Sequence, residues 1–367
     1  MTFRLPPRPR ARTLMHRLDG HAQARPEALA FRFLRGAGFE TDDLPYGELR
    51  RRALRVAAAL RRRHAEGSRV LLVLHPGLDY IACFLGCLYA GAIAVPIYPP
   101  RRNRNFDRFA TVVADSGARF ALALPAVRRE TEAAVAPAAA KAVAWLTPEG
   151  DGDDPFDWDL PYTDAETPAF LQYTSGSTAE PRGVVVSHGN LEHNLELLAE
   201  PFAMTADEVT GLSWLPPFHD LGLIGNLLAS VHHGTPSVLM APQTFLADPL
   251  FWLRAITHFK ATASSAPNFA YELCAARATP ETLAGLDLRS WRTAFNGAEP
   301  ILPATLERFA RTFAPCGFSA EAFCPGYGLA EATLVVSAQP RGRGACLRSF
   351  DREALARHRI VPVADGA

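Results

Sequence analysis

Short apolar runs alternate with longer amphipathic segments along most of this 367-residue chain. A short continuous apolar run bounded by Gly, Pro or polar residues is typical of a buried strand, and a longer segment with a 3.6-residue period is typical of a helix. Strands that are apolar on both faces belong to parallel sheets covered by helices. The alternation therefore predicts a layered α/β fold.

The pattern occurs in two blocks, separated by a segment rich in Asp, Pro and Gly. Strands are expected at 69–74, 94–98, 119–124, 142–146, 169–174, 184–187, 237–240, 262–265 and 293–296. Helices are expected at 78–90, 106–116, 127–140, 191–200, 221–233, 250–259, 268–276 and 303–313. The interruption predicts a linker (151–168) between a first α/β subdomain (14–150) and a second α/β subdomain (169–345). Residues 1–13, rich in Pro and Arg, are expected to form a flexible arm, and residues 346–367 follow the second subdomain.

The composition excludes several classes of function. The chain is 48% hydrophobic and 21% charged, with a formal net charge of zero, so bulk electrostatics predict no nucleic-acid surface. No apolar stretch reaches the length of a membrane span. The N-terminus is rich in Arg and Pro but lacks the apolar core of a secretory signal. We therefore expect a cytoplasmic protein without a nucleic-acid partner or a membrane span.

Residues 173–183 (YTSGSTAEPRG) are the most informative segment. A loop of Gly, Ser and Thr directly after a strand presents backbone N–H groups and hydroxyls that suit phosphate oxygens. Gly176 and Gly183 permit close approach of the backbone. The segment is not a GxxxxGK[ST] loop, because the lysine and the second glycine are missing at the required spacing. A surface linker is the alternative, which the flanking strands disfavour.

This segment resembles the phosphate loop T-S-G-[ST]-[ST]-x-x-P-K-G of the adenylate-forming (AMP-binding) superfamily, with Arg182 in place of the usual lysine. Other segments resemble one branch of that superfamily, the fatty acyl-AMP ligases. They are 77–80 (GLDY), 89–103 (YAGAIAVPIYPPRRN), 171–174 (LQYT), 214–225 (WLPPFHDLGLIG), 296–300 (NGAEP) and 323–333 (FCPGYGLAEAT). The resemblance extends from about residue 13 to the end. It implies the large N-terminal domain of such an enzyme, with layered αβαβα subdomains and the ATP motifs in the second.

The resemblance also implies ATP and Mg²⁺ as cofactors, and it gives three residues a catalytic role. His219 would lie beside the substrate carboxylate and orient its attack on the α-phosphorus, Arg182 would be a cation near the phosphates, and Glu331 would coordinate magnesium. Tyr327 would stack on adenine. The nucleotide-binding residues would be Thr174, Ser175, Gly176, Ser177, Thr178, Gly183, Gly297, Ala298, Glu299, Tyr327 and Gly328.

Several of these residues also have a plainer interpretation. His219 would be a structural histidine, Tyr327 a core aromatic, and Glu299 a charge at a helix N-terminus ahead of Pro303. Asp220 would cap the helix that begins near residue 221.

Two further features leave alternatives open. Ala330 stands where the wider superfamily has threonine, as is usual in the fatty acyl-AMP ligase branch, and Thr333 is a candidate substitute hydroxyl. The apolar stretches 221–231 and 245–256 either line an acyl tunnel or form ordinary core helices.

The predicted function is ATP-dependent activation of a fatty acid to its acyl-adenylate, with release of pyrophosphate. The acceptor would be an acyl carrier protein or a polyketide synthase, in polyketide or lipopeptide biosynthesis. The alternatives are an acyl-CoA synthetase and a non-catalytic nucleotide- or acyl-binding remnant.

Enzymes of this kind carry a mobile C-terminal domain with a catalytic lysine, whereas Lys141 and Lys260 match no catalytic position. Residues 346–367 resemble the start of an insertion typical of the branch. We therefore expect the C-terminal domain to be absent, and ATP binding and adenylation by this chain alone to be weak.

Overall fold

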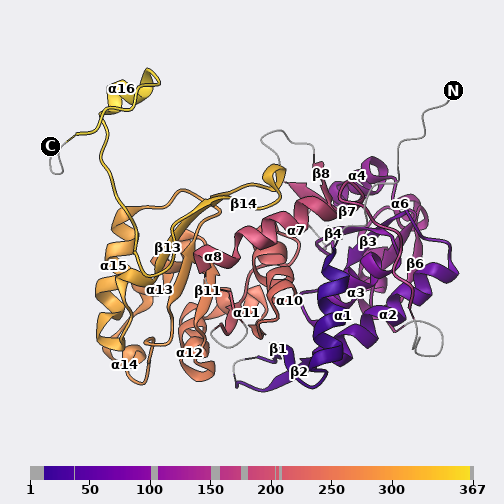
Figure 1. Cartoon of the computed structure of the whole chain (residues 1–367), viewed down its shortest axis with the longest axis horizontal. Helices are drawn as coiled ribbons and strands as arrows, with labels where there is room; N and C mark the ends of the chain where they lie inside the picture. Colours follow the sequence, from indigo (N-terminus) through magenta and orange to yellow (C-terminus); the bar gives the residue numbers. More distant parts are fainter. Residues whose placement is uncertain are drawn as a thin grey trace.

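The strands of the computed structural model form two sheets, both flanked by helices (Figure 1). The structure describes residues 12–36, 38–100, 106–149, 158–174, 181–202, 204–205 and 209–363. Most neighbouring strands are parallel. The predicted layered α/β fold is therefore confirmed. Within the described ranges, none of the helices has the length and apolar character needed to cross a membrane.

The first sheet has the strand order β6-β5-β3-β4-β7-β8. Its strands are β3 (Arg69–Val73), β4 (Ile93–Ile97), β5 (Phe120–Leu122), β6 (Ala144–Leu146), β7 (Pro168–Thr174) and β8 (Arg182–Ser187). The helices that accompany them are α2 (Tyr46–Arg62), α3 (Leu78–Tyr89), α4 (Phe106–Ser116), α5 (Pro125–Ala134) and α6 (Pro137–Lys141). The helix expected at 127–140 is two helices, because Pro137 cannot donate the backbone hydrogen bond that would continue the first one.

Successive residues of β3 show why its sequence is apolar throughout. Val70 and Leu72 pack in one hydrophobic cluster, and Leu71 and Val73 pack in another on the opposite face. All four are fully buried. Alternate side chains of a strand point to opposite faces, so a continuous apolar run means that both faces are covered.

The second sheet has the strand order β14-β13-β12-β11-β9-β10-β1-β2. Its strands are β1 (Leu29–Leu34), β2 (Thr41–Pro45), β9 (Gly211–Ser213), β10 (Ser237–Leu239), β11 (Ala263–Ala266), β12 (Thr293–Asn296), β13 (Phe323–Gly328) and β14 (Val335–Ala338). The helices are α1 (Leu14–Ala24), α7 (His188–Leu197), α8 (Ala199–Phe202), α9 (Asp220–Gly222), α10 (Ala229–His233), α11 (Pro242–Ala247), α12 (Pro249–Phe259), α13 (Asn268–Arg277), α14 (Pro280–Leu283), α15 (Pro303–Phe313) and α16 (Arg352–Ala356). A π-helical turn, Leu223–Leu228, joins α9 to α10.

The two sheets exchange strands across the predicted subdomain boundary at 151–168. Strands β1 and β2 come from the first predicted subdomain but belong to the second sheet, where Phe31 pairs with Ser237 of β10. Strands β7 and β8 come from the second predicted subdomain but complete the first sheet. The division into sheets therefore differs from the division along the chain, since strand partners are set by packing and not by proximity in sequence.

The stretch 245–256 is part of an aromatic core. Phe245, Phe251 and Trp252 are fully buried, and the ring of Trp252 packs edge-on against Trp291, with 5.1 Å between centroids. Of the two apolar stretches expected to line a tunnel or to form core, this one is core.

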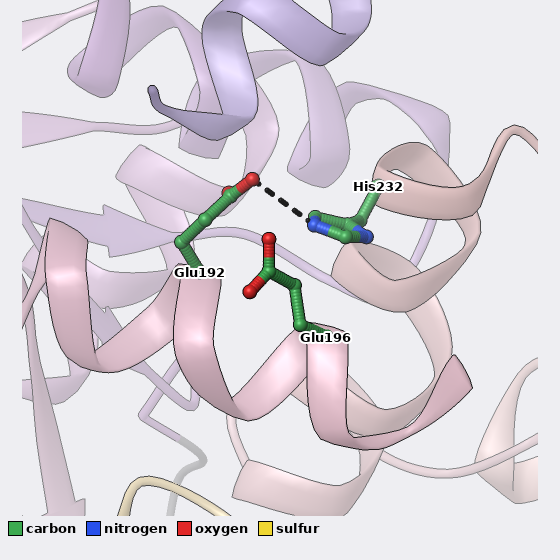
Figure 2. A group of neighbouring side chains, drawn as sticks. All are labelled: Glu192, Glu196 and His232. Atoms are coloured by element: carbon green, nitrogen blue, oxygen red, sulfur yellow. Dashed lines mark hydrogen bonds and ion pairs between the residues drawn. The ribbon is translucent and has the colours of Figure 1, made fainter. Parts of the chain in front are cut away.

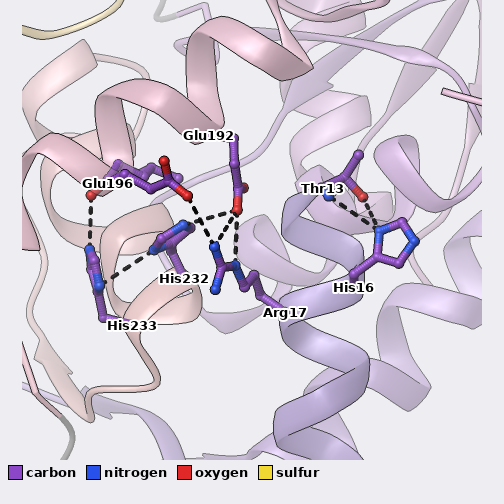
Figure 3. Close-up of polar contacts among 8 residues, drawn as sticks. Thr13, His16, Arg17, Glu192, Glu196, His232 and His233 are labelled. Carbon is purple, nitrogen blue, oxygen red and sulfur yellow. Dashed lines mark hydrogen bonds and ion pairs between the residues drawn. The ribbon is translucent and has the colours of Figure 1, made fainter. Parts of the chain in front are cut away.

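A polar junction of Arg17, Glu192, Glu196 and His232 connects α1, α7 and α10 (Figure 3). Arg17 Nε donates to Glu192 Oε1 at 2.9 Å, and His232 Nε2 lies 3.1 Å from the same oxygen. Burial alone would raise the pKa of Glu192, but its hydrogen bonds with His232 and Arg17 lower that pKa overall. The junction therefore contains a stable carboxylate that holds three helices together.

Glu192, Glu196 and His232 also have the grouping of a metal site, with ligand atoms within 4.8 Å of one another (Figure 2). The guanidinium of Arg17 lies 2.8 Å from Glu192 and 3.4 Å from Glu196. The guanidinium of Arg17 thus already supplies the positive charge that a metal ion would provide. Glu192, Glu196 and His232 therefore have a structural role.

The buried His188, at the start of α7, predicts a pH-dependent stability. Burial lowers its pKa to about 4, against the opposing attraction of Glu192, whereas an unfolded histidine titrates near 6.5. Acidification therefore protonates the unfolded state first, and stability is lost as the pH falls from 7 toward 4. Between pH 7 and 5, His188→Leu should lose about 2 kcal/mol less unfolding free energy than the unmodified chain.

Urea denaturation followed by circular dichroism at pH 7, 6 and 5 measures this difference. His193→Leu is the matched control, because His193 lies on the same helix but is exposed. If the unfolding free energy fell by the same amount between pH 7 and 5 in the unmodified chain and in His188→Leu, the prediction would be contradicted.

Candidate active site

The loop between β9 and α9 is held from the other sheet. Tyr80 of α3 donates to the carbonyl of Pro217 at 2.9 Å, and Gln172 of β7 donates to the carbonyl of Phe218 at 2.8 Å. The ring of Tyr98 packs edge-on against Phe218, at a centroid distance of 5.0 Å. These contacts position the next residue, His219.

His219 and Asp220 act as a pair at the start of α9. Their Nδ1 and Oδ1 atoms lie 2.6 Å apart, and the same Asp220 oxygen accepts from the N–H of Leu221 at 2.6 Å. The hydrogen bond with Asp220 raises the pKa of His219, although burial opposes it. The N-cap of α9 is His219 and Asp220 is the first residue of the helix, so the interpretation that Asp220 caps it is wrong by one position. The carboxylate of Asp220 keeps the imidazole protonated to higher pH.

A cavity of about 190 Å³ brings His219 and Asp220 together with Ala298, Tyr327 and Gly328. Tyr327 is 61% exposed, so it is not the core aromatic of the plainer interpretation. The apolar lining consists mainly of Leu198, Phe202, Met204, Val209, Leu221, Phe295, Leu334 and Val335. The cavity therefore combines polar groups at its mouth with a long apolar wall.

The segment from Asp220 to His233 forms one side of this cavity. Leu221, Gly225, Asn226 and Ser230 line it, whereas no residue of the stretch 245–256 does. The π-helical turn in this segment widens the helix and changes the direction of the side chains that follow. The two alternatives left open for the stretch 221–231 therefore both apply in part: these four residues line the cavity, whereas Leu223, Ile224 and Leu228 belong to the core.

The segment after β12 closes tightly on β13. Ala298 lines the cavity with a φ of +66°, a conformation that is uncommon outside glycine. A Cβ on Gly297 would lie 2.8 Å from the carbonyl oxygen of Gly326, so a side chain there would separate the two segments. Glu299 accepts from the N–H of Phe269 at 2.5 Å. The Glu299 carboxylate therefore lies at the N-terminus of α13, and not at that of α15, which begins at Pro303.

The turn that carries Glu331 follows β13 directly. A Cβ on Gly328 would overlap the carbonyl of Leu334, so only glycine permits this close return of the chain. Thr333 has a φ of +71°, in a turn closed by the N–H of Leu334 and the carbonyl of Ala332 at 2.9 Å. Glu331 is exposed on this turn and is not among the residues that line the cavity.

The predicted phosphate loop connects two antiparallel strands. Thr174 pairs with Arg182 across β7 and β8, and the next pair joins Tyr173 to Gly183. A Cβ on Gly183 would lie 2.9 Å from the ring of Tyr173, so the glycine accommodates that ring. Arg182 is exposed. The predicted loop residues Ser175, Gly176, Ser177 and Thr178 lie outside the described residues.

Residues 18–353 match the protein family described as "AMP-binding enzyme". This chain belongs to that family. The chain is 37% identical to the medium-chain-fatty-acid–[acyl-carrier-protein] ligase JamA of Moorena producens, over 97% of this chain and 61% of JamA. It is 36% identical to the long-chain-fatty-acid–AMP ligase FadD23 of Mycobacterium tuberculosis, over 93% of this chain and 60% of the relative.

Solved structures of AMP-binding enzymes show the same fold. The fatty acyl-adenylate ligase of L. pneumophila, in complex with acyl adenylate and pyrophosphate, superposes with a TM-score of 0.86 at 38% identity. That match covers 97% of this chain and 62% of the ligase. The chain thus spans about three fifths of the length of these relatives.

Asn194 of α7 positions part of the candidate site, and sequence reasoning missed it. From α7 its carboxamide accepts from the N–H of Val335 at 3.0 Å and donates to the carbonyls of Ala332 and Val335 at 3.3 and 3.2 Å. It therefore fixes the turn that carries Glu331. The available signal was a polar residue on the apolar helix face that includes Leu191 and Leu195.

Gly222 provides a test of how tightly the His219 loop is held. A Cβ at this position would overlap the carbonyl of Pro216, which is backbone and cannot rotate away. We expect Gly222→Ala to displace the loop and to cost about 1–3 kcal/mol of unfolding free energy. Urea denaturation measures this loss of stability.

Gly20→Ala in α1 is the control, because nothing lies within 4 Å of a Cβ there. That change should be neutral or stabilise the chain by up to about 1 kcal/mol. If Gly222→Ala retained the stability of the unmodified chain, the loop would not be locked as inferred.

Proposed function

We propose that this chain binds ATP and a fatty acid and catalyses formation of the acyl-adenylate with release of pyrophosphate. The observation that carries the proposal is a cavity that joins His219 and Tyr327 to an apolar wall. A fatty acid has two parts that match these: a carboxylate, which His219 could bind, and an apolar chain, which the apolar wall could contact. The relatives named as fatty-acid ligases and the ligase bound to acyl adenylate support this substrate.

In the proposed reaction the chain mainly positions charges. The protonated imidazole of His219, oriented by Asp220, donates a hydrogen bond to the fatty-acid carboxylate and directs it at the α-phosphorus. The carboxylate oxygen then forms a bond to that phosphorus in line as the bond to pyrophosphate breaks. Arg182 and the N–H groups of the loop that precedes it offset the charge of the phosphates.

The nucleotide would occupy the mouth, where Tyr327 presents an exposed ring and Ala298 an unusual backbone conformation. The exposed carboxylate of Glu331 fits a magnesium ligand, because Mg²⁺ prefers a few carboxylate oxygens together with phosphate oxygens. Magnesium at this position would neutralise charge on the phosphates. Gly297, Glu299 and Gly328 then shape the backbone around the nucleotide, and Asn194 keeps Glu331 in place.

The acceptor in our proposal is an acyl carrier protein or a polyketide synthase, in polyketide or lipopeptide assembly. Two relatives, JamA and TtuA of Teredinibacter turnerae, are named as acyl-carrier-protein ligases, which favours a carrier protein over coenzyme A. Transfer of the acyl group would follow adenylation. An acyl-CoA synthetase and a non-catalytic binding protein are the alternatives.

Mass-spectrometric detection of acyl-adenylate tests the proposal. The purified chain at stoichiometric concentration is incubated with magnesium-ATP and a panel of fatty acids, with and without coenzyme A. We expect acyl-adenylate that is not converted to acyl-CoA. Glu331→Ala should lower its yield by at least about tenfold, since a charge-neutralising ligand is lost from the transition state.

Glu353→Ala serves as the control, because Glu353 is an exposed carboxylate on α16. Formation of acyl-CoA would favour the acyl-CoA synthetase. A folded chain that yields no adenylate with any acid would favour the non-catalytic binding protein.

The raised pKa of His219 predicts a pH profile. If the imidazolium is the active form, the adenylation rate falls as the pH rises through this pKa. Asp220→Asn removes the carboxylate that raises the pKa, so the fall should occur at lower pH. His219→Gln should be about a hundredfold slower and should lack this limb of the profile. Identical profiles for the unmodified chain and Asp220→Asn would rule out the imidazolium as the active form.

A further inference from the structure

The segment after Glu331 contains a γ-turn with a positive φ at its centre. The central residue, Thr333, has φ +71° and ψ −61°, and the N–H of Leu334 donates to the carbonyl of Ala332 at 2.9 Å. The rare, strained form of the γ-turn has angles of about +75° and −65°. A residue with a branched Cβ is an outlier at a positive φ, because its side chain crowds the backbone. Such a turn persists only where the surrounding structure holds it.

The carboxamide of Asn194 holds this γ-turn on both sides of Thr333. It projects from α7, and the residue is 5% exposed. Its Nδ2 donates to the carbonyl of Ala332 at 3.3 Å and to the carbonyl of Val335 at 3.2 Å. Its Oδ1 accepts from the N–H of Val335 at 3.0 Å. One side chain therefore fixes the backbone before and after the strained residue.

The other hydrogen bonds of the turn are local. The N–H of Leu329 donates to the carbonyl of Leu334, and the N–H of Thr333 donates to the carbonyl of Ala330, both at 2.9 Å. Within the part of the chain that the structure describes, Asn194 is the only side chain that hydrogen-bonds the backbone of residues 332–335. The connection of this turn to a distant element thus depends on Asn194.

The γ-turn is shared by the two parts of the proposed active site. On one side it follows Glu331, the exposed carboxylate that fits a magnesium ligand. On the other side, Leu334 and Val335 line the cavity. Leu334 also lies opposite Gly225 of the cavity wall, where a Cβ would lie 3.2 Å from its Cδ2. Movement of the turn would therefore displace the carboxylate and the apolar wall together.

We propose that Asn194 is a positioning residue that preorganises the acid-binding cavity and the magnesium-binding carboxylate through this one strained turn. The inference rests on the proposed function, because it takes the cavity to hold the acid and Glu331 to bind magnesium. In the unmodified chain the γ-turn is already formed before either ligand binds. The cost of forming it therefore reduces the affinity of neither ligand.

Loss of Asn194 has a specific consequence for binding. The γ-turn then relaxes in part of the molecules, and the apparent affinity of a ligand that needs the turn falls in proportion to the fraction that retains it. Because the acid and the magnesium nucleotide both need the turn, both affinities fall by the same factor. The ligand that binds first restores the turn, so the second ligand binds with its original affinity. Damage confined to one of the two sites gives neither result.

Isothermal titration calorimetry of the whole chain measures these affinities without turnover. The probes are decanoate, and magnesium with α,β-methylene-ATP, whose P–C–P bridge prevents release of pyrophosphate. We expect Asn194→Ala to weaken the binding of each probe alone by about tenfold, as loss of hydrogen bonds from a buried position allows. With the other probe saturating, the loss should shrink to about twofold or less. Asn194→Asp has nearly the same size and keeps the acceptor but loses both donors, and it should give the same pattern.

Substitutions of Thr333 test whether strain in the turn is the cause. Glycine adopts a positive φ without strain, so Thr333→Gly added to Asn194→Ala should restore the affinity for decanoate to within about threefold of the unmodified chain. Thr333→Ala added to Asn194→Ala should restore nothing, because alanine also lacks the hydroxyl but keeps a strained Cβ. The comparison separates relief of strain from loss of the hydroxyl.

Asn190→Ala is the matched control. Asn190 is an exposed residue of the same helix, and its Oδ1 accepts from the N–H of Ser187 at the helix start, at 3.2 Å. Its replacement should lower the stability of the chain in urea denaturation and leave both affinities unchanged.

Three results would overturn the proposal: unchanged affinities in Asn194→Ala, loss of affinity for only one probe, or losses that persist when the other probe is saturating. In each of these cases the unmodified chain still binds both probes, and the proposed function stands. If the unmodified chain fails to bind decanoate or the magnesium nucleotide, it is the proposed function that fails.

Discussion

The arrangement of the site depends on two hydrogen bonds that cross between the sheets. Tyr80 and Gln172, which belong to the first sheet and its helices, bond the carbonyls of Pro217 and Phe218 in a loop of the second sheet. His219 comes next in that loop. Because backbone carbonyls are the acceptors, the loop conformation itself is held, and Gly222 leaves no room for it to shift toward α9. The position of the imidazole is therefore a consequence of how the two sheets pack.

This constraint explains why a histidine–aspartate pair at the mouth can do more than cap a helix. Its neighbours in the cavity are largely apolar, and electrostatic interactions strengthen where water is excluded. The short contact with Asp220 therefore raises the pKa of His219 despite partial burial. In the proposed reaction, an apolar acyl chain that fills the cavity would exclude more water and strengthen the same pair. Binding of the acyl chain would then be coupled to activation of the carboxylate.

The sequence was sufficient to predict the layers of the fold but not which strands pair with one another. The apolar run of β3 identifies a strand covered on both faces, yet nothing local indicates that Phe31 lies beside Ser237 or that β7 joins the first sheet. Such pairings join segments far apart in the chain, and they depend on the packing of the whole. This is why the predicted boundary at 151–168 does not separate the two sheets.

The same limit applies to the site. The motifs identified His219, Ala298, Tyr327 and Gly328, and the structure brings these four to one cavity. The motifs could not separate Glu299, whose carboxylate bonds the start of α13, from residues that line the cavity. Asn194 was missed because its importance lies in contacts between distant segments. The role of a buried polar residue can be assigned only when its hydrogen-bond partners are known.

The segment from Asp220 to His233 shows how one helical unit joins these features. Its first turn carries the Asp220 carboxylate, its π-helical turn and Ser230 form the wall, and His232 at its end enters the polar junction with Glu192. Because Arg17 neutralises that junction, α1 holds the far end of the segment while the loop at Pro217 holds the near end. A helix fixed at both ends cannot rotate to hide Ser230 or Asn226 from the cavity. The residues of this segment that line the cavity are therefore as firmly positioned as the mouth.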